Sequence, residues 1–306
     1  MRSMIFRSPA RGGQARRLSG FTLVELLVAI TIIGIMIAMA MPAVQAARES
    51  ARRATCLNNL ARIGMALQDY ESAHETLPPG TIDKQGPIHN APSGYQMSWL
   101  VQLLPYIDER PVFEHVDFSV GAYDKKNAAV RAIHVALFTC PSYCGPARNG
   151  SDAAQGGADE AGLPGTCTVS NYAGCHNDVE APIDADNHGV MFLNSHISRT
   201  DVTDGLASTL YVGEKLGDQQ DLGWMSGTRA TLRNTGTSLD KSRDLDAPKN
   251  DLTVGGFAAQ HPTICNFLFG DGRAVSISEQ IDLKLLQRYG NRADGQLIDH
   301  GPTRSE

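Results

Sequence analysis

An apolar run near the N-terminus constrains the fold of this chain more than any other feature. Residues 21–41 include 17 that are Ala, Val, Ile, Leu, Met or Phe. A helix of that length measures roughly 31 Å, which is enough to cross the hydrocarbon core of a bilayer. Glu25 is the single charge in the run, and an ionised carboxylate there costs on the order of 2.5–3.5 kcal/mol without a partner. The sequence therefore predicts a transmembrane helix with one carboxylate near its start.

The segment before this run predicts the orientation of the helix. Residues 1–20 contain five arginines and no acidic residue. Basic flanks stay in the cytoplasm, so we expect a single-pass protein of the inner membrane with an extracytoplasmic C-terminal domain. Without those five of the 27 basic residues, 22 remain against 33 acidic ones, a net charge of −11. An acidic exported domain argues against nucleic acid as a partner.

The boundary between the basic leader and the apolar run has a recognisable pattern, made of Gly20, Phe21 and Glu25, with Pro42 beyond the run. A secretory signal peptide is cut after its apolar segment, and residues 38–40 offer such a small-x-small site as the competing interpretation. Here Gly20 comes before the run. The pattern resembles the prepilin processing site of type IV pilins and type II secretion pseudopilins. The resemblance implies cleavage after Gly20 by prepilin peptidase and methylation of Phe21; a signal anchor with a coincidental Gly-Phe is the other alternative.

Beyond Pro42 the helical pattern continues but becomes amphipathic. Apolar residues recur at three- and four-residue spacing from Val44 to Tyr70, and charged residues lie between them. We expect this half to lie in water with one face on the exported domain. The predicted divisions are a leader at 1–20, a transmembrane helix at 21–41, its amphipathic continuation at 42–76 and a globular domain at 77–306.

The globular region favours an α+β fold, pilin-like, in which the long N-terminal helix packs on an antiparallel β-sheet domain with long loops. The patterns predict a helix over 127–138, strands over 168–172, 189–193 and 209–213, and a loop over 228–251.

The tail predicts a β-hairpin in which strands at 264–269 and 273–278 are joined by Asp271 and Gly272. Asp-Gly between apolar runs favours a two-residue type I′ turn. That register pairs Leu268 with Val275 and, extended backwards, places His261 opposite Asp282. A helix over 283–289 with Asp282 as N-cap follows.

Several segments resemble one large family of prepilin-type proteins with a C-terminal domain of unknown function. They are residues 21–25, 42–49, 56–60, 78–80, 98–100, 138–142, 170–174, 204–205 and 212–214, and the tail motif of His261, Asp271 and Gly272. The resemblance implies a pseudopilin-like envelope protein and supplies no activity. It implies prepilin peptidase, other pseudopilin subunits, an inner-membrane assembly platform and lipid as partners.

Six cysteines stand at 56, 140, 144, 167, 175 and 265, and on the exported side of a membrane they favour disulfides. The 15 pairings of six thiols stay open from sequence alone. Cys56 and Cys140 both match positions of the family pattern, and Cys140 follows an apolar segment expected to pack on the helix. A Cys56–Cys140 bridge is therefore the best single prediction.

Metal sites are not predicted. Cys140 and Cys144 have a spacing found in zinc sites, but Cys167 and Cys175 do not complete a second such pair. Between Asp178 and Asn187, acidic and amide side chains crowd a short loop with oxygen ligands suited to calcium. We expect a solvated acidic loop there and keep calcium as an open alternative.

Catalysis is not predicted either. His261 and Asp271 invite a catalytic interpretation, but a turn needs Asp271 and a histidine can satisfy a neighbouring carboxylate. The sequence contains no nucleophile-elbow, zinc-protease or phosphate-loop motif. We expect a structural subunit that assembles through its N-terminal helix into a pseudopilus or filament of a type II secretion or type IV pilus-like system. The alternative is a non-polymerising, membrane-anchored extracytoplasmic ligand-binding domain, with an anchored hydrolase as a weaker third.

Overall fold

The computed structural model describes residues 22–143, 168–217, 221–239 and 250–296. Helix α1 runs over Leu23–His74 without interruption at Pro42. The part of the chain up to Arg48 forms one unit and the part from Glu49 onward forms another. From Thr22 to Arg48 every residue except Ala29 is exposed. This segment is long and apolar enough to cross a membrane, and none of its apolar window is buried against the protein.

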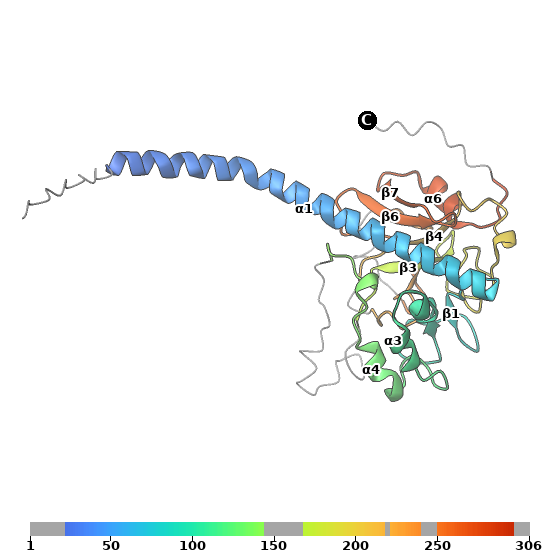
Figure 1. The fold of residues 1–306 in the computed structure, drawn as a ribbon. Coiled ribbons are helices and arrows are strands. Elements are labelled where there is room, and N and C mark those ends of the chain that lie inside the picture. The colour runs from blue at the N-terminus through green and yellow to red at the C-terminus, as the bar shows by residue number, and fades with distance from the viewer. Residues whose placement is uncertain (1–21, 144–167, 218–220, 240–249, 297–306) are drawn as a thin grey trace, which may run out of the picture. The chain divides into compact units, whose positions relative to one another are not determined.

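The second unit is built on a five-stranded sheet in the order β5-β3-β4-β6-β7. Its strands are β3 (Tyr172–Asn177), β4 (Leu210–Glu214), β5 (Leu232–Asn234), β6 (Ile264–Phe269) and β7 (Ala274–Ser278). Figure 1 labels β3, β4, β6 and β7 of this sheet. Neighbours are antiparallel except β5, which pairs parallel with β3, so the sheet is mixed. The prediction of a structureless loop over 228–251 was wrong at β5. All three residues of this strand are buried, so its sequence lacks the alternation of apolar and polar residues that would have indicated a strand. A separate ribbon joins β1 (Thr81–Ile82) to β2 (Met97–Ser98).

The outer half of α1 lies on this sheet, as its amphipathic pattern predicts. Its buried residues are Cys56, Asn59, Leu60, Ile63, Gly64, Ala66, Leu67 and Tyr70. At Gly64 the backbone comes so close to β6 that a Cβ atom would lie 2.8 Å from a methyl carbon of Leu268. Nε of Arg53 donates a hydrogen bond to Oγ of Ser276 at 3.1 Å, which ties the helix to β7.

The remaining helices are short. They are α2 (Trp99–Leu103), η1 (Leu104–Tyr106), α3 (Arg110–Glu114), η2 (Lys125–Asn127), α4 (Ala128–Arg131), η3 (Ala136–Phe138), η5 (Arg199–Asp201) and α6 (Leu283–Gly290). The continuous helix predicted over 127–138 was wrong. The Ile133 carbonyl accepts hydrogen bonds from Oγ1 of Thr168 and Nε1 of Trp224, and these tertiary partners replace the helical ones.

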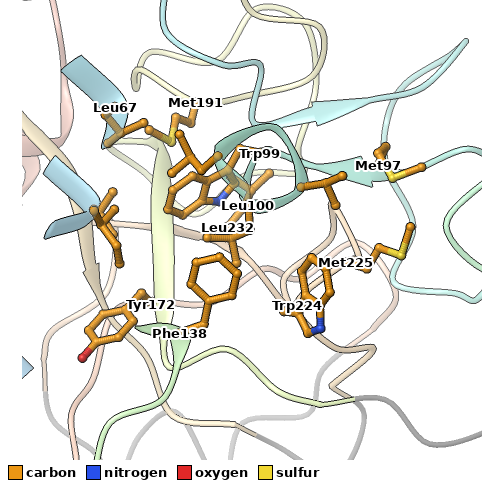
Figure 2. Packing of buried hydrophobic residues seen from close by; sticks show 14 of the residues in the cluster. Leu67, Met97, Trp99, Leu100, Phe138, Tyr172, Met191, Trp224, Met225 and Leu232 are labelled. Carbon is orange, nitrogen blue, oxygen red and sulfur yellow. The ribbon is translucent and has the colours of Figure 1, made fainter. Parts of the chain in front are cut away.

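Aromatic and aliphatic side chains fill the core between the sheet and these helices (Figure 2). Trp99 and Trp224 are buried, and Nε1 of Trp99 donates to the Thr231 carbonyl at 2.8 Å. Phe138 packs its ring 5.9 Å from that of Trp224. The buried indole groups are therefore satisfied, as buried polar atoms must be.

The tail forms the predicted hairpin in a different register. Phe267 pairs with Val275 and Leu268 with Ala274, one residue from the prediction. Gly272 has φ +87°, whereas Asp271 is not among the described residues with positive φ, so the turn is not type I′. Helix α6 begins where predicted, and the Asp282 side chain accepts a hydrogen bond from the backbone N–H of Leu285.

The three predicted strands have different outcomes. The prediction over 209–213 is confirmed by β4, and the one over 168–172 was displaced because β3 begins at Tyr172. Residues 189–193 form no strand of the described sheets and contribute a single bridge between Leu193 and Thr81.

Candidate functional site

The most chemically concentrated place in the described residues is a buried cluster around His261. Helix α1 contributes Glu49, Arg52 and Cys56, whose spacing of three and four residues puts them on one face. Glu214 is the last residue of β4, and His261 lies three residues before the start of β6. The β4–β6 pairing therefore brings the last two together beside the helix.

Two carboxylates flank the imidazole of His261. Nδ1–H donates to Oε1 of Glu49 at 2.6 Å, and Nε2 lies 3.4 Å from Oε1 of Glu214. The side chains of His261 and Glu214 are 1% and 2% exposed. Nε and one terminal nitrogen of Arg52 donate to Oε2 of Glu49, and Nε also donates to Oγ of Ser142 at 3.1 Å.

The pKa values of this cluster follow from that arrangement. Burial opposes protonation of His261, but the hydrogen bonds and charges of Glu214 and Glu49 outweigh it and raise the pKa of His261 above its ordinary value. Burial likewise opposes ionisation of Glu49, and His261 and Arg52 outweigh it and lower the pKa of Glu49. The arrangement therefore favours protonation of His261.

A disulfide between Cys56 and Cys140 lies against this histidine. The two Cα atoms are 5.6 Å apart, within the normal range for a bridge, and the residues are 84 apart in sequence. Nε2 of His261 lies 3.5 Å from Sγ of Cys140. The pairing predicted from the family positions is thus the one that the structure contains.

The two residues of the tail motif do different things. Asp271 lies in the turn after β6, where its carboxylate accepts a hydrogen bond from the backbone N–H of Arg273 at 3.0 Å. His261 precedes the start of β6, whereas Asp271 follows its end. His261 and Asp271 therefore do not form a catalytic pair. Asp271 and Gly272 shape the hairpin, while His261 belongs to the buried cluster.

The processing residues Gly20 and Phe21 lie outside the described residues. Glu25 lies in the first turn of α1 and is exposed. Its Oε2 accepts hydrogen bonds from the backbone N–H and Oγ1 of Thr22, at 2.9 and 2.8 Å, and its own N–H donates to Oγ1 of Thr22. This reciprocal pattern is a helix-capping arrangement.

Of the two metal sites considered from sequence, the cysteine site lies only partly within the described residues. Cys140 is bonded to Cys56, and Cys144 and Cys167 lie outside the described residues. In the acidic loop the Glu180 carboxylate accepts from the backbone N–H groups of Val254 and Gly255, an Asp178 oxygen lies 2.9 Å from Nδ1 of His188, and Asp184 caps its own turn. In the structure these carboxylates hold the loop to its neighbours.

The sequence pattern identified His261, Cys56 and Cys140 but not the glutamates beside them. Glu49 ends the family-like segment 42–49, and Glu214 ends the family-like segment 212–214. A signal was therefore present, since both are charged residues at the edge of a shared motif. Their convergence on His261 required the fold, because 212 residues separate Glu49 from His261.

Comparisons with known proteins agree with this description. Residues 16–41 match the prokaryotic N-terminal methylation motif, and with the exposed apolar helix this defines a pilin-like, prepilin-type protein anchored in a membrane. Residues 45–284 match the family described as a protein of unknown function (DUF1559), and the chain belongs to that family. Searches among curated proteins and among solved structures gave no match. The resemblance stated from the sequence is therefore confirmed, and neither matched description is that of an enzyme.

Proposed function

We propose that this chain is a pseudopilin-like structural subunit, cut after Gly20 by prepilin peptidase, methylated on Phe21 and assembled through α1 into a pseudopilus or filament. The observation that carries the proposal is the stretch of α1 up to Arg48, whose residues are exposed except for Ala29 and which lies largely within the methylation motif matched over residues 16–41. Each large apolar side chain left in water costs about 1.5–3 kcal/mol. Such a helix needs lipid before assembly and neighbouring apolar helices afterwards.

Location and partners follow from the same segment. The basic leader supports an orientation with the N-terminus in the cytoplasm and the domain after α1 outside the inner membrane. An inner-membrane assembly platform would extract the helix, and copies of this chain or related pseudopilins would surround it. The buried His261 cluster would then be a structural part of the subunit.

Glu25 has a defined part in this proposal. Cleavage after Gly20 creates a positive amine on Phe21, four residues before Glu25. In a filament, the carboxylate of one subunit would pair with the amine of its neighbour and so set the axial step between subunits. Inside its own chain Glu25 is held by Thr22 through one oxygen, Oε2.

Processing is tested by the mass and N-terminal sequence of the chain purified from membranes. We expect a chain beginning at N-methylated Phe21, and we expect Gly20→Ala to remain largely uncut while the control Ser19→Ala is processed normally. A mature N-terminus at Met41 or beyond would show ordinary signal cleavage and overturn this part of the proposal.

Assembly is tested with Glu25→Leu and the nearly isosteric Glu25→Gln. Both should be inserted and processed, because each removes a costly charge from the membrane, but both should fail to form filaments unless mixed with wild type. Asp69→Asn, which removes an exposed charge farther along α1, is the matched control and should assemble. Electron microscopy, blue-native gels and cysteine crosslinking through residues 21–45 give the readout. Processed wild-type chains that stay monomeric would favour the anchored ligand-binding domain, and normal filaments from Glu25→Leu would eliminate the pairing.

A further inference from the structure

The buried cluster contains four potential metal ligands in one place. They are Sγ of Cys56, Sγ of Cys140, Nε2 of His261 and an oxygen of Glu214, and these atoms all lie within 4.8 Å of one another. All four residues are buried. In the structure the two sulfurs are bonded to each other, so the question is what the cluster becomes when that bond is reduced.

The distances in the cluster already approach those of a tetrahedral zinc site. Zinc bound at about 2.3 Å to sulfur and about 2.0–2.1 Å to nitrogen and oxygen gives ligand–ligand edges of roughly 3.3–3.8 Å. Nε2 of His261 lies 3.5 Å from Sγ of Cys140 and 3.4 Å from Oε1 of Glu214. These two distances already fit a tetrahedral zinc ion. The main movement needed to bind zinc is separation of the two sulfur atoms.

The ligands also have the supporting contacts that metal sites use. Nδ1–H of His261 donates to Glu49 at 2.6 Å, the carboxylate–histidine arrangement that fixes the tautomer and leaves Nε2 available to a metal. Oε2 of Glu214 accepts from the backbone N–H of Asn266 at 2.9 Å, which orients the carboxylate.

The other oxygen of Glu214 supplies an independent indication. Oε1 of Glu214 is buried, and its polar contact among the described residues is the long one to Nε2 of His261, at 3.4 Å. A buried carboxylate oxygen with one long contact is incompletely satisfied, and a cation placed between it and the sulfurs would complete its coordination.

We propose that reduction of the Cys56–Cys140 disulfide converts this cluster into a binding site for a zinc ion, with two thiolates, one imidazole and one carboxylate as ligands. A dithiol reductant supplies two electrons and two protons, so that the protein gains two thiols and the reductant becomes a cyclic disulfide. Zinc then binds Cys56, Cys140, Nε2 of His261 and Oε1 of Glu214, and the two thiol protons, with any proton on Nε2, pass to solvent. Thiolate and imidazole ligands in tetrahedral geometry favour Zn²⁺ over Mg²⁺ or Ca²⁺.

The experiment uses the full chain in detergent, with an affinity tag that contains no histidine. Cys144→Ser and Cys167→Ser are introduced first, so that those two thiols cannot contribute ligands. The protein is reduced with dithiothreitol, freed of reductant without oxygen, and titrated with Zn²⁺ against a chromogenic chelator and with Co²⁺ by absorption spectroscopy. We expect one equivalent of metal bound by the reduced chain, a tetrahedral cobalt spectrum with thiolate charge-transfer bands, and no binding by the oxidised chain.

Ligand variants locate the metal. His261→Gln and Glu214→Gln should weaken zinc binding by at least tenfold, and Glu49→Gln by about 10–100-fold as an outer-sphere residue. His134→Gln, at an exposed histidine, is the matched control and should bind as wild type does. Bound zinc should also slow alkylation of Cys56 and Cys140 in the reduced wild-type chain.

Several outcomes would overturn the proposal. They are no stoichiometric metal on the reduced chain, equal binding by the oxidised chain, and unchanged affinity in a folded His261→Gln. If circular dichroism shows that a ligand variant does not fold, the cobalt spectrum and the alkylation pattern of the wild-type chain still test the proposed site. Without thiolate bands, or with Cys56 and Cys140 unprotected, the site is wrong.

Discussion

His176 and His261 are both buried histidines whose surroundings shift their pKa values in opposite directions. His261 lies between two carboxylates, which raise its pKa. Burial lowers the pKa of His176 to about 4, and the charge of Arg233 adds to the effect while a hydrogen bond with Asn187 opposes it. Nδ1–H of His176 donates to Oδ1 of Asn187 at 3.2 Å, and among the described residues Nε2 has no hydrogen-bond partner. The fold therefore holds His176 as neutral imidazole.

This difference predicts how stability responds to acid. In the unfolded chain a histidine has a pKa of about 6.5, so below that pH the proton binds the unfolded chain in preference to His176 of the folded chain. The stabilisation is present above pH 6.5 and is lost as the pH falls toward 4. Between pH 7 and pH 5 the free energy of unfolding should drop by on the order of 2 kcal/mol from this residue.

The variant His176→Phe isolates the effect. At pH 7 it should be less stable by about 1 kcal/mol, because one buried hydrogen bond is lost. From pH 7 to pH 5 it should lose less stability than wild type, so that the two converge or cross. Urea unfolding at both pH values measures this, with His134→Gln as the control. Parallel losses in wild type and His176→Phe would show that His176 is not the titrating group.

At the scale of elements, the hairpin of β6 and β7 shows what Gly272 contributes. Gly272 has φ +87°, and a Cβ atom there would also lie 2.8 Å from Nε2 of Gln68 on α1. We expect Gly272→Ala to lower the free energy of unfolding by about 1–2 kcal/mol through backbone strain. Asp271→Asn, which keeps an acceptor for the Arg273 N–H, should cost less. Urea denaturation compares them, and equal stability of Gly272→Ala and wild type would contradict this role.

The hairpin also shows how far sequence patterns reach. Asp-Gly identified the turn. The pair suits both a two-residue turn with two positive φ values and a longer turn with one, and the structure contains the longer turn, with its positive φ at Gly272. Local sequence patterns predicted the structure correctly where the residues that determine an element lie within it, as in α1 and at the Asp282 N-cap of α6. They failed where a distant partner decides, as at Ile133, whose carbonyl is bound by Thr168 and Trp224.

The candidate site was predictable only in part for the same reason. Motif positions pointed to Cys56, Cys140 and His261, and the pairing of the two cysteines followed from the resemblance. Glu49 and Glu214 approach His261 from two other elements, α1 and β4. The sequence around each glutamate does not predict its contact with His261. The parallel position of β5 beside β3 is equally non-local.

For the whole molecule, the Cys56–Cys140 bridge is a large contribution to stability. It spans 84 residues, and the loop-entropy relation gives about 4–5 kcal/mol for closing such a loop. Total stabilities are typically about 5–15 kcal/mol, so the bridge is a large share. Replacing both cysteines by serine should lower the free energy of unfolding by this amount, as measured by urea unfolding with EDTA present. Reduced wild type is the matched comparison, and a loss below about 1 kcal/mol would contradict the entropic account.

The position of this bridge on α1 also has a mechanical consequence. Tension on the apolar segment enters the second unit at Glu49, where the helix begins to lie on it. Held by side-chain packing alone, the helix would peel from the sheet one turn at a time from that end. Cys56 lies two turns further along and is covalently joined to Cys140, so peeling stops there. Any stronger pull is transmitted through covalent bonds into the body of the domain.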